Sequence, residues 1–329
     1  MEGILLFAET DEGQINPGFW ELVSVGRRLS SQLVNKLRVA VQGWKVGVPE
    51  AALRSGADQV YVAEDPRLAE PWPDAHLAAL TALCRDLQPA MIVMPRTPLG
   101  LELAVRLAYR LDGTLVQDAM TLQVTEDGLT ATRPVSGGAV LATVRLAKKP
   151  WIVVPYRRAF SPAEPMAERE GELMTVQPNL PEEALKTKCE PQVRQQSTGP
   201  NLERARVIVA GGMGLGGPEP FELLQEIADL VGGAVGASRP PCDVGWVPPA
   251  MQIGLTGKTV AADVYIAVGI SGAIQHMAGC SSSRTIVAIN NDPKAHIFHM
   301  ATYGVVGDWQ EVLPAFRDAL ANHAARPKG

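Results

Sequence analysis

Apolar runs and helix-compatible segments alternate along this chain, and residues 264–280 give the clearest pattern. An apolar run from Val264 to Ile270 stops at Ser271-Gly272 and continues into residues that favour a helix. A continuous apolar run, unlike an alternating one, is typical of a strand buried on both faces of a parallel sheet. The pattern therefore predicts a strand, a tight turn and a helix start, with helices covering both faces of the sheet.

The turn after this apolar run is suited to an anion such as a phosphate. Gly269 and Gly272 allow a sharp turn, and Ser271 is predicted to cap a helix that offers free N–H groups. His276 lies about 140° around that helix from Ser271. Its imidazole is predicted to lean over Gly272 and Ala273, where nothing shields it. From these residues alone, His276 fits a structural role at a helix surface as well as it fits a ligand contact.

The first half of the chain alternates predicted strands and helices. The strands are residues 4–8, 39–43, 59–62 and 91–94. The helices are residues 19–33, 50–55, 74–87 and 99–111. Such βαβα alternation predicts a parallel sheet with right-handed crossovers.

Four short runs then change the pattern. They are separated by turn signals, and they predict an antiparallel extension at the edge of the sheet: residues 119–124, 129–134, 139–145 and 151–154. The polar residues near the earlier strand ends (Glu9, Thr10, Arg96, Thr97) form no phosphate loop, and no Gly-x-Gly-x-x-Gly follows Ala8. We interpret this domain, residues 1–185, as a scaffold or an interface.

Residues 186–203 are predicted to be a linker, because they are polar and rich in Pro, Gln and Ser. A second domain, residues 204–329, begins with a strand at 206–210 and a glycine-rich turn. Further elements follow at residues 221–230, 264–270, 285–290, 303–306 and 310–323. This order predicts a doubly wound α/β domain, so the whole chain is expected to be α/β with two mostly parallel sheets and flanking helices.

Polar or glycine residues follow the apolar part of each strand in the second domain. They should meet at the carboxyl edge of one sheet, where open α/β domains bind ligands. A glycine-rich turn alone is as typical of a tight connection as of a ligand site. Five such positions together indicate a ligand of dinucleotide size: Gly211-Gly212, Ser238-Arg239, Ser271-Gly272, Asn290 and Asp308.

Composition narrows the classes of partner. The net charge of −5 and the pI near 5.6 argue against recognition of nucleic acid or anionic membranes through bulk charge. The cysteines are widely spaced and predict free thiols in a reducing compartment rather than a metal site: Cys84, Cys189, Cys242 and Cys280. No apolar run approaches the roughly 18 residues of a membrane span. We expect a cytoplasmic protein without membrane insertion.

Six separated motifs of the second domain form a recognisable series. They lie at residues 210–215, 235–239, 252–258, 265–276, 286–290 and 303–308. In order and spacing, residues 205–320 closely resemble the flavin-binding half of electron transfer flavoprotein alpha subunits. The first domain resembles that family in layout more than in motifs. The resemblance implies FAD in residues 204–329 and a beta subunit as partner of residues 1–185.

The resemblance also implies roles for individual residues. Arg239, with Ser238 beside it, matches the arginine over the isoalloxazine, and Thr256 matches a threonine near flavin N5. Residues 271–276 match the stretch along the diphosphate and ribityl chain, with His276 near the pyrimidine end, and Asn290 and Asp308 match the adenosine end. The full set of implied FAD contacts is Met213, Ser238, Arg239, Ile253, Gly254, Leu255, Thr256, Ser271, Gly272, Ala273, Ile274, Gln275, His276, Asn290, Asp308 and Trp309.

The role of Arg239 is also supported by physical reasoning. Reduced flavin gains negative charge near its pyrimidine ring, and a fixed cation in a site that excludes water stabilises that charge. Arginine suits this task because it does not deprotonate and stacks on planar rings.

The chain departs from the usual pattern of this family at four positions. Met213 replaces arginine, Leu255 replaces glutamine, His296 replaces proline and Thr302 replaces aspartate. We hypothesise that the missing cation at Met213 weakens FAD retention or lowers the flavin potential, so that Met213→Arg should reverse both. Compensation by a residue of the partner subunit is the alternative.

The resemblance implies an electron carrier rather than an enzyme that transforms a substrate, and no catalytic residue or metal site is predicted. With a beta subunit it would shuttle electrons from flavin dehydrogenases to a quinone reductase or another acceptor. Two alternatives stay open. The chain could belong to an electron-bifurcating complex with a further FAD in the beta subunit, or it could be a nucleotide-binding assembly subunit with a reduced redox role.

Overall fold

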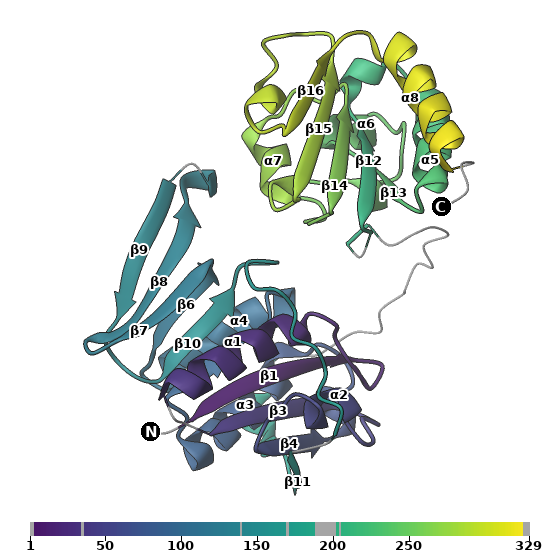
Figure 1. The fold of residues 1–329 in the computed structure, drawn as a ribbon. Helices are drawn as coiled ribbons and strands as arrows, with labels where there is room; N and C mark the ends of the chain where they lie inside the picture. Colours follow the sequence, from purple (N-terminus) through teal and green to yellow (C-terminus); the bar gives the residue numbers. More distant parts are fainter. Residues whose placement is uncertain are drawn as a thin grey trace. The chain divides into compact units, whose positions relative to one another are not determined.

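The computed structural model describes residues 3–33, 36–138, 140–168, 171–187, 202–203 and 205–324. The chain divides into two compact units, Met1–Gln192 and Val193–Gly329 (Figure 1). Most of the predicted linker, together with Cys189, lies outside the described residues. Among the helices that are described, none has both the length and the apolar character needed to cross a membrane.

The first unit is built on a parallel sheet with the strand order β11-β4-β3-β1-β5-β10-β6. Its strands are β1 (Ile4–Asp11), β3 (Leu37–Gly43), β4 (Gln59–Glu64), β5 (Met91–Val93), β6 (Thr114–Ala119), β10 (Trp151–Pro155) and β11 (Glu172–Val176). A short strand pairs antiparallel with β1, namely β2 (Gln14–Ile15). The helices are α1 (Phe19–Leu33), α2 (Glu50–Leu53), α3 (Pro73–Leu87) and α4 (Pro98–Arg110).

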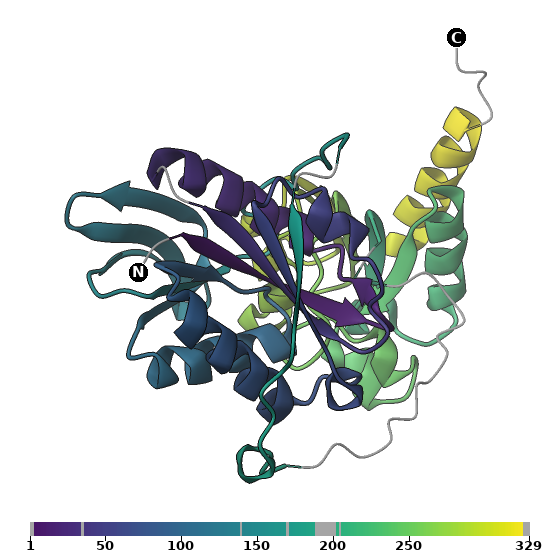
Figure 2. The same ribbon diagram turned by 90° about the horizontal axis from the view of Figure 1, so that it is seen from below.

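Helices cover both faces of this sheet, as Figure 2 shows for the first unit. Alternate side chains of β1 point to opposite faces, as the pleat of a strand requires. Ile4 and Leu6 pack in one core with Val23 of α1, whereas Leu5 and Phe7 pack in the other with residues of α3 and α4. The continuous apolar run at β1 therefore identified a strand buried on both sides.

The prediction of an antiparallel edge is wrong for the last of its four apolar runs, residues 151–154. β10 lies between β5 and β6 and pairs parallel with both, so residues 151–154 belong to the interior of the main sheet. The other runs form a separate three-stranded antiparallel sheet: β7 (Thr121–Thr125), β8 (Gly128–Val135) and β9 (Val140–Leu146). The apolar sequence Trp-Ile-Val-Val is typical of a doubly covered strand, and its short length and neighbouring turns obscured that signal.

The second unit has a five-stranded, all-parallel sheet with the order β13-β12-β14-β15-β16. Its strands are β12 (Val207–Gly211), β13 (Ala234–Ala237), β14 (Val264–Val268), β15 (Thr285–Asn290) and β16 (Tyr303–Val306). Its helices are α5 (Pro220–Leu230), α6 (Arg239–Asp243), α7 (Ile274–Cys280) and α8 (Trp309–Ala324). Short 3-10 helices occur in both units: η1 (Pro66–Leu68), η2 (Ser136–Gly138), η3 (Glu182–Ala184), η4 (Met213–Leu215), η5 (Pro249–Met251) and η6 (His296–His299).

The doubly wound prediction is confirmed in the second unit. Ile266 of β14 packs in one core with Leu224 of α5 and Leu313 of α8, whereas Tyr265 packs in the other with Met277 of α7. Figure 1 shows α5 and α8 on one side of the sheet and α7 on the other. The chain leaves β12 toward β13 and then crosses back to β14 on the other side of β12. This reversal creates a switch point between β12 and β14, where a crevice forms at the carboxyl ends of the strands.

His76 of α3 is a buried histidine in the first unit. Its Nε2 lies 3.1 Å from the carbonyl oxygen of Glu70, which can only accept, so Nε2 carries the hydrogen. Its Nδ1 then accepts from the side-chain amide nitrogen of Gln42, 3.1 Å away once that amide is oriented to suit the network. Burial lowers the pKa of His76 from 6.5 to about 4, so the neutral ring is the folded form.

We therefore expect protonation of His76 to destabilise the first unit as the pH falls from neutral. The unfolded chain binds a proton at His76 near pH 6.5, and the folded chain does so only near pH 4, so stability falls as the pH drops through this window. Chemical denaturation should show a loss of about 2 kcal/mol attributable to this group between pH 7 and pH 5. His76→Gln should flatten that slope, while His323→Gln, which alters an exposed histidine, should leave it unchanged. Equal slopes in all three proteins would contradict the assignment.

Candidate functional site

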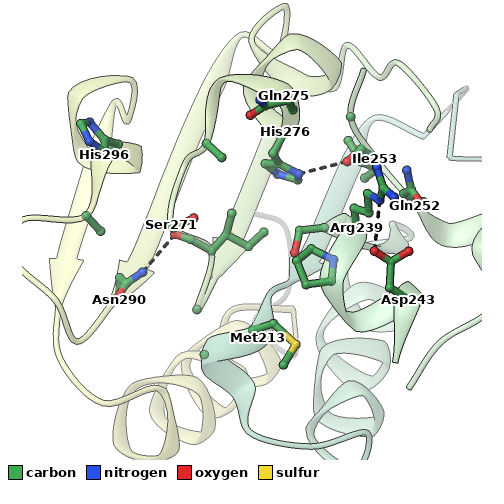
Figure 3. A pocket seen from close by; sticks show the side chains of 18 of the residues that line it. Met213, Arg239, Asp243, Gln252, Ile253, Ser271, Gln275, His276, Asn290 and His296 are labelled. Atoms are coloured by element: carbon green, nitrogen blue, oxygen red, sulfur yellow. Dashed lines mark hydrogen bonds and ion pairs between the residues drawn. The ribbon is translucent and has the colours of Figure 1, made fainter. Parts of the chain in front are cut away.

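A pocket with a cavity volume of about 640 Å³ lies at the carboxyl edge of the second sheet. That size is within the range of small-molecule and cofactor sites. Its walls come from the segments that follow β12, β13, β14 and β15 (Figure 3). Four strand ends thus contribute to one cavity, and the cavity lies at the switch point of the sheet.

The turns after β12 and β14 touch through their backbones. The Gly214 N–H donates to the Gly269 carbonyl at 3.0 Å, and the Gly212 N–H donates to the Val268 carbonyl at 2.9 Å. A Cβ placed on Gly212 would lie 2.2 Å from the Gly269 oxygen, closer than any side chain tolerates. Gly269 itself has φ of +62°, a conformation that favours glycine. Glycine at these positions is therefore a requirement of the contact.

The prediction that Ser271 caps a helix is wrong. α7 begins at Ile274, with Ala273 at the capping position and no capping bond from a side chain. The reason is Gly272, whose φ of +85° cannot continue into a right-handed helix. The chain bends here because Gly272 packs against the backbone of Ile297, whose N–H donates to the Ser271 carbonyl at 3.0 Å. This bond joins the segment after β15 to the segment after β14.

Arg239 begins α6 at one end of the pocket. The N–H of Ser238, just before it, donates to the Gly211 carbonyl at 3.0 Å, which fixes the backbone beside β12. The Arg239 Nε donates to Asp243 Oδ2 at 3.1 Å, one helical turn further on. The side chains of Arg239 and Asp243 are 63% and 57% exposed, so the pair is weak in water and its strength depends on what covers it.

A second loop, residues 252–258, forms the wall next to Arg239. Its Ile253 N–H donates to the Ala237 carbonyl at 2.8 Å, and its Leu255 N–H donates to the Gln275 carbonyl at 2.7 Å. The Gln252 side-chain amide donates to Thr256 Oγ1 at 2.9 Å. Since that oxygen accepts from Gln252, the hydroxyl hydrogen of Thr256 stays available to a ligand acceptor.

His276 is buried, so the prediction that nothing shields it is wrong. Its Nδ1 lies 3.0 Å from the Ile253 carbonyl oxygen and its Nε2 lies 2.9 Å from the hydroxyl of Tyr265. A carbonyl only accepts, so Nδ1 carries the hydrogen and Nε2 accepts from Tyr265. Burial lowers the pKa of His276 from 6.5 to about 4. The ring lines the pocket as a neutral group with both nitrogens already bonded. The covering loop is distant in sequence, which is why helix geometry alone missed it.

Most of the residues predicted for the site line this cavity. They are Met213, Ser238, Arg239, Ile253, Gly254, Leu255, Thr256, Ser271, Ala273, Gln275, His276 and Asn290. Four predicted residues are not part of its lining: Gly272, Ile274, Asp308 and Trp309. Trp309 instead donates from Nε1 to the Gly214 carbonyl at 3.1 Å, and Asp308 accepts from the Gln310 N–H at the start of α8. Trp309 thus holds the turn that carries Gly214, and Asp308 caps the start of α8.

Sequence reasoning missed ten lining residues. Some are neighbours of predicted ones, and the rest follow β15: Gly214, Pro240, Asp243, Gln252, Gly269, Ile270, Asp292, Lys294, Ala295 and His296. The rule that polar residues after a strand gather at the carboxyl edge applies to the segment after Asn290 as well. When this rule is applied to the few residues beyond Asn290, it identifies Asp292, Lys294 and His296.

Comparison with protein families gives two matches that together span most of the chain. The profile described as "Electron transfer flavoprotein domain" matches residues 4–181. The profile described as "Electron transfer flavoprotein FAD-binding domain" matches residues 201–281. The second match includes the segments after β12, β13 and β14 that line the pocket.

Curated relatives match over almost their full length. The chain is 37% identical over 320 residues to an electron transfer flavoprotein subunit alpha of Thermoanaerobacterium thermosaccharolyticum, covering 96% of this chain and 97% of that protein. It is 36% identical over 312 residues to the Bacillus subtilis protein of the same name, covering 94% and 95%. It is 38% identical over 328 residues to a Protein FixB of Azorhizobium caulinodans, covering 96% and 88%.

The backbone contact between the two glycine turns can be tested with a pair of alanine substitutions. Gly212→Ala should lower the free energy of unfolding by roughly 1–3 kcal/mol, because the new Cβ meets backbone that cannot move away. Gly217→Ala is the matched control in the same turn, since its Cβ would meet only the flexible carboxylate of Glu219, and it should change stability by less than about 1 kcal/mol. Urea denaturation of the full chain measures both. Similar losses from the two substitutions would refute the contact.

Proposed function

The chain belongs to the electron transfer flavoprotein alpha-subunit family, and we propose that the pocket of its second unit holds FAD with the flavin ring beside Arg239. Its family membership makes FAD the cofactor and electron transfer the function. The position of FAD in this pocket is our proposal. The observation that carries it is the meeting of four segments, each following a parallel strand, around one cavity at the switch point.

The pocket fits FAD in shape and chemistry. It extends from Arg239, after β13, to Asn290, at the end of β15, so a long ligand can lie across the strand ends. Glycine at Gly214 and Gly269 lets the two turns that line the cavity pack backbone against backbone, where any Cβ would intrude. Figure 3 shows Ser271 and Asn290 on one side of the cavity and Arg239 on the other.

Bound FAD supplies the redox chemistry, and the residues of the pocket tune it. Arg239 places a fixed positive charge where reduction increases negative charge on the ring. Its Nε is held by Asp243, which orients the guanidinium and leaves the terminal nitrogens for the ligand. As the flavin displaces water, the field of this cation grows, because the local dielectric falls.

Thr256 and His276 complete the flavin end of the site with different roles. Thr256 can donate its hydroxyl hydrogen to a ring nitrogen such as N5, since its oxygen already accepts from Gln252. His276 contributes shape but neither charge nor a free N–H, because Ile253 and Tyr265 occupy its two nitrogens. We therefore assign the electrostatic stabilisation at this end to Arg239.

The family normally pairs with a beta subunit. We propose a heterodimer of this chain with a beta subunit that takes electrons from a flavin dehydrogenase and passes them to a quinone reductase or another acceptor. We also propose a cytoplasmic location. The free, buried thiols of Cys84, Cys242 and Cys280 support it, because such cysteines suit a reducing compartment.

The role of Arg239 predicts a change in flavin potential. Arg239→Gln should lower the potential of the first electron by roughly 65–130 mV, the equivalent of losing a charged contact of about 1.5–3 kcal/mol. The flavin potential of Arg239→Lys should lie between those of the unmodified protein and Arg239→Gln, since lysine keeps the charge but lacks the planar fork of arginine. Arg284→Gln is the matched control, because Arg284 is an exposed arginine outside the pocket and its loss changes the net charge equally. Spectroelectrochemistry of the heterodimer measures all four proteins, and unchanged potentials in both Arg239 variants would rule the role out.

The flavin content of the purified heterodimer separates the proposed function from its alternatives. We expect one FAD per heterodimer, measured by absorbance after denaturation and extraction. Two FAD molecules would instead support an electron-bifurcating complex, and none would support an assembly subunit without redox work.

A further inference from the structure

The phosphates of FAD need positive partners, and the described residues of the pocket offer few. The lining includes three basic side chains besides the neutral His276, namely Arg239, Lys294 and His296. Arg239 is already paired with Asp243 at the flavin end. The glycine turn after β12 contributes Met213 and Gly214, and neither carries a charge. Lys294 and His296 are thus the remaining basic groups.

The segment that carries these two residues is held firmly against the middle of the pocket. Asn290 donates from Nδ2 to the Ile270 carbonyl at 3.0 Å and accepts the Asp292 N–H at 3.0 Å. Asp292 Oδ1 in turn accepts the N–H of Lys294 at 2.9 Å. Each polar side chain therefore fixes the backbone of a residue further along, and the segment has a defined shape before a ligand binds.

His296 is brought next to Ser271 by the packing of this segment. The N–H of Ile297 donates to the Ser271 carbonyl at 3.0 Å, so His296 directly precedes a residue bonded to the turn. Its ring lies 5.9 Å from that of His299, measured between centroids. Figure 3 shows His296 on the same side of the cavity as Asn290 and Ser271, and away from Arg239.

We propose that Lys294 and His296 bind the diphosphate of FAD, and that Lys294 supplies the positive charge that the turn at Met213 lacks. This inference rests on the proposed function. Lys294 contributes a point charge, and His296 contributes an N–H donor whichever tautomer it adopts. Arg239 stays free to act on the ring because the phosphates have their own partners. The carboxylate of Asp292, which accepts the Lys294 N–H through Oδ1, also lines the pocket and offsets part of the positive charge of Lys294.

The proposal predicts which ligands depend on the two residues. In the heterodimer stripped of flavin, Lys294→Gln and His296→Ala should each weaken FAD binding about three- to tenfold at low salt, a range typical of a charge-assisted contact near solvent. ADP, which shares the diphosphate, should lose affinity similarly when it competes with FAD. Riboflavin, which has no phosphate, should bind all variants equally. The losses of FAD and ADP affinity should be smaller at high salt, because ions screen exposed charges. Flavin fluorescence titration measures the dissociation constants.

Two further proteins make this test decisive. Arg284→Gln removes one exposed positive charge at the amino edge of the same sheet, just before β15, and should leave FAD affinity unchanged. Met213→Arg, added to a protein that carries both Lys294→Gln and His296→Ala, should restore much of the lost affinity, because it returns a cation to another wall of the pocket. Equal weakening of riboflavin and FAD, or no weakening of either, would overturn the proposal. Absence of FAD binding in the unmodified heterodimer would instead refute the proposed function.

Discussion

Backbone of the turn after β12 lies directly against backbone of the turn after β14, and the pocket depends on this contact. Gly214 donates to Gly269 across it, and a Cβ on Gly212 would collide with the Gly269 oxygen. Two parallel strands that adjoin at a switch point can bring their following turns this close only if neither carries a side chain there. Gly254 and Gly279 repeat the arrangement, with a Cβ on Gly279 only 2.4 Å from the Gly254 nitrogen. The segments around the cavity are therefore fixed by backbone packing, which preorganises the site.

The basic and acidic side chains of the pocket lie at its two ends. Arg239 and Asp243 form one end, beside a histidine that burial keeps neutral, and Lys294 and His296 form the other. A long anionic cofactor with a redox-active ring at one end and phosphates further along matches that division. Because His276 contributes no charge, we propose that the potential of the ring depends on Arg239 and on how far Asp243 offsets it. The proposal thus assigns the holding and the tuning of the cofactor to different residues.

The sequence predicted the second unit well because its central strands β12 and β14 are buried and read as continuous apolar runs. It placed Arg239, Ser271 and Asn290 around one cavity, since parallel strands end at a common edge, and the family resemblance added Thr256. It failed where contacts join residues distant in the chain. The burial of His276 depends on Ile253 and Tyr265, and the late start of α7 depends on Gly272 packing against Ile297. β10 was misplaced because strand order in a sheet is a long-range property that local turn signals do not encode.

The most direct test of this account is a crystal structure of the heterodimer with FAD bound. We expect the isoalloxazine in contact with Arg239 and the loop at Thr256, the diphosphate beside Ser271, Lys294 and His296, and the ring nitrogens of His276 still bonded to Ile253 and Tyr265. FAD bound in the reverse direction, with its adenine beside Arg239, would contradict the division of charge between the two ends. FAD bound outside this pocket would contradict the site itself.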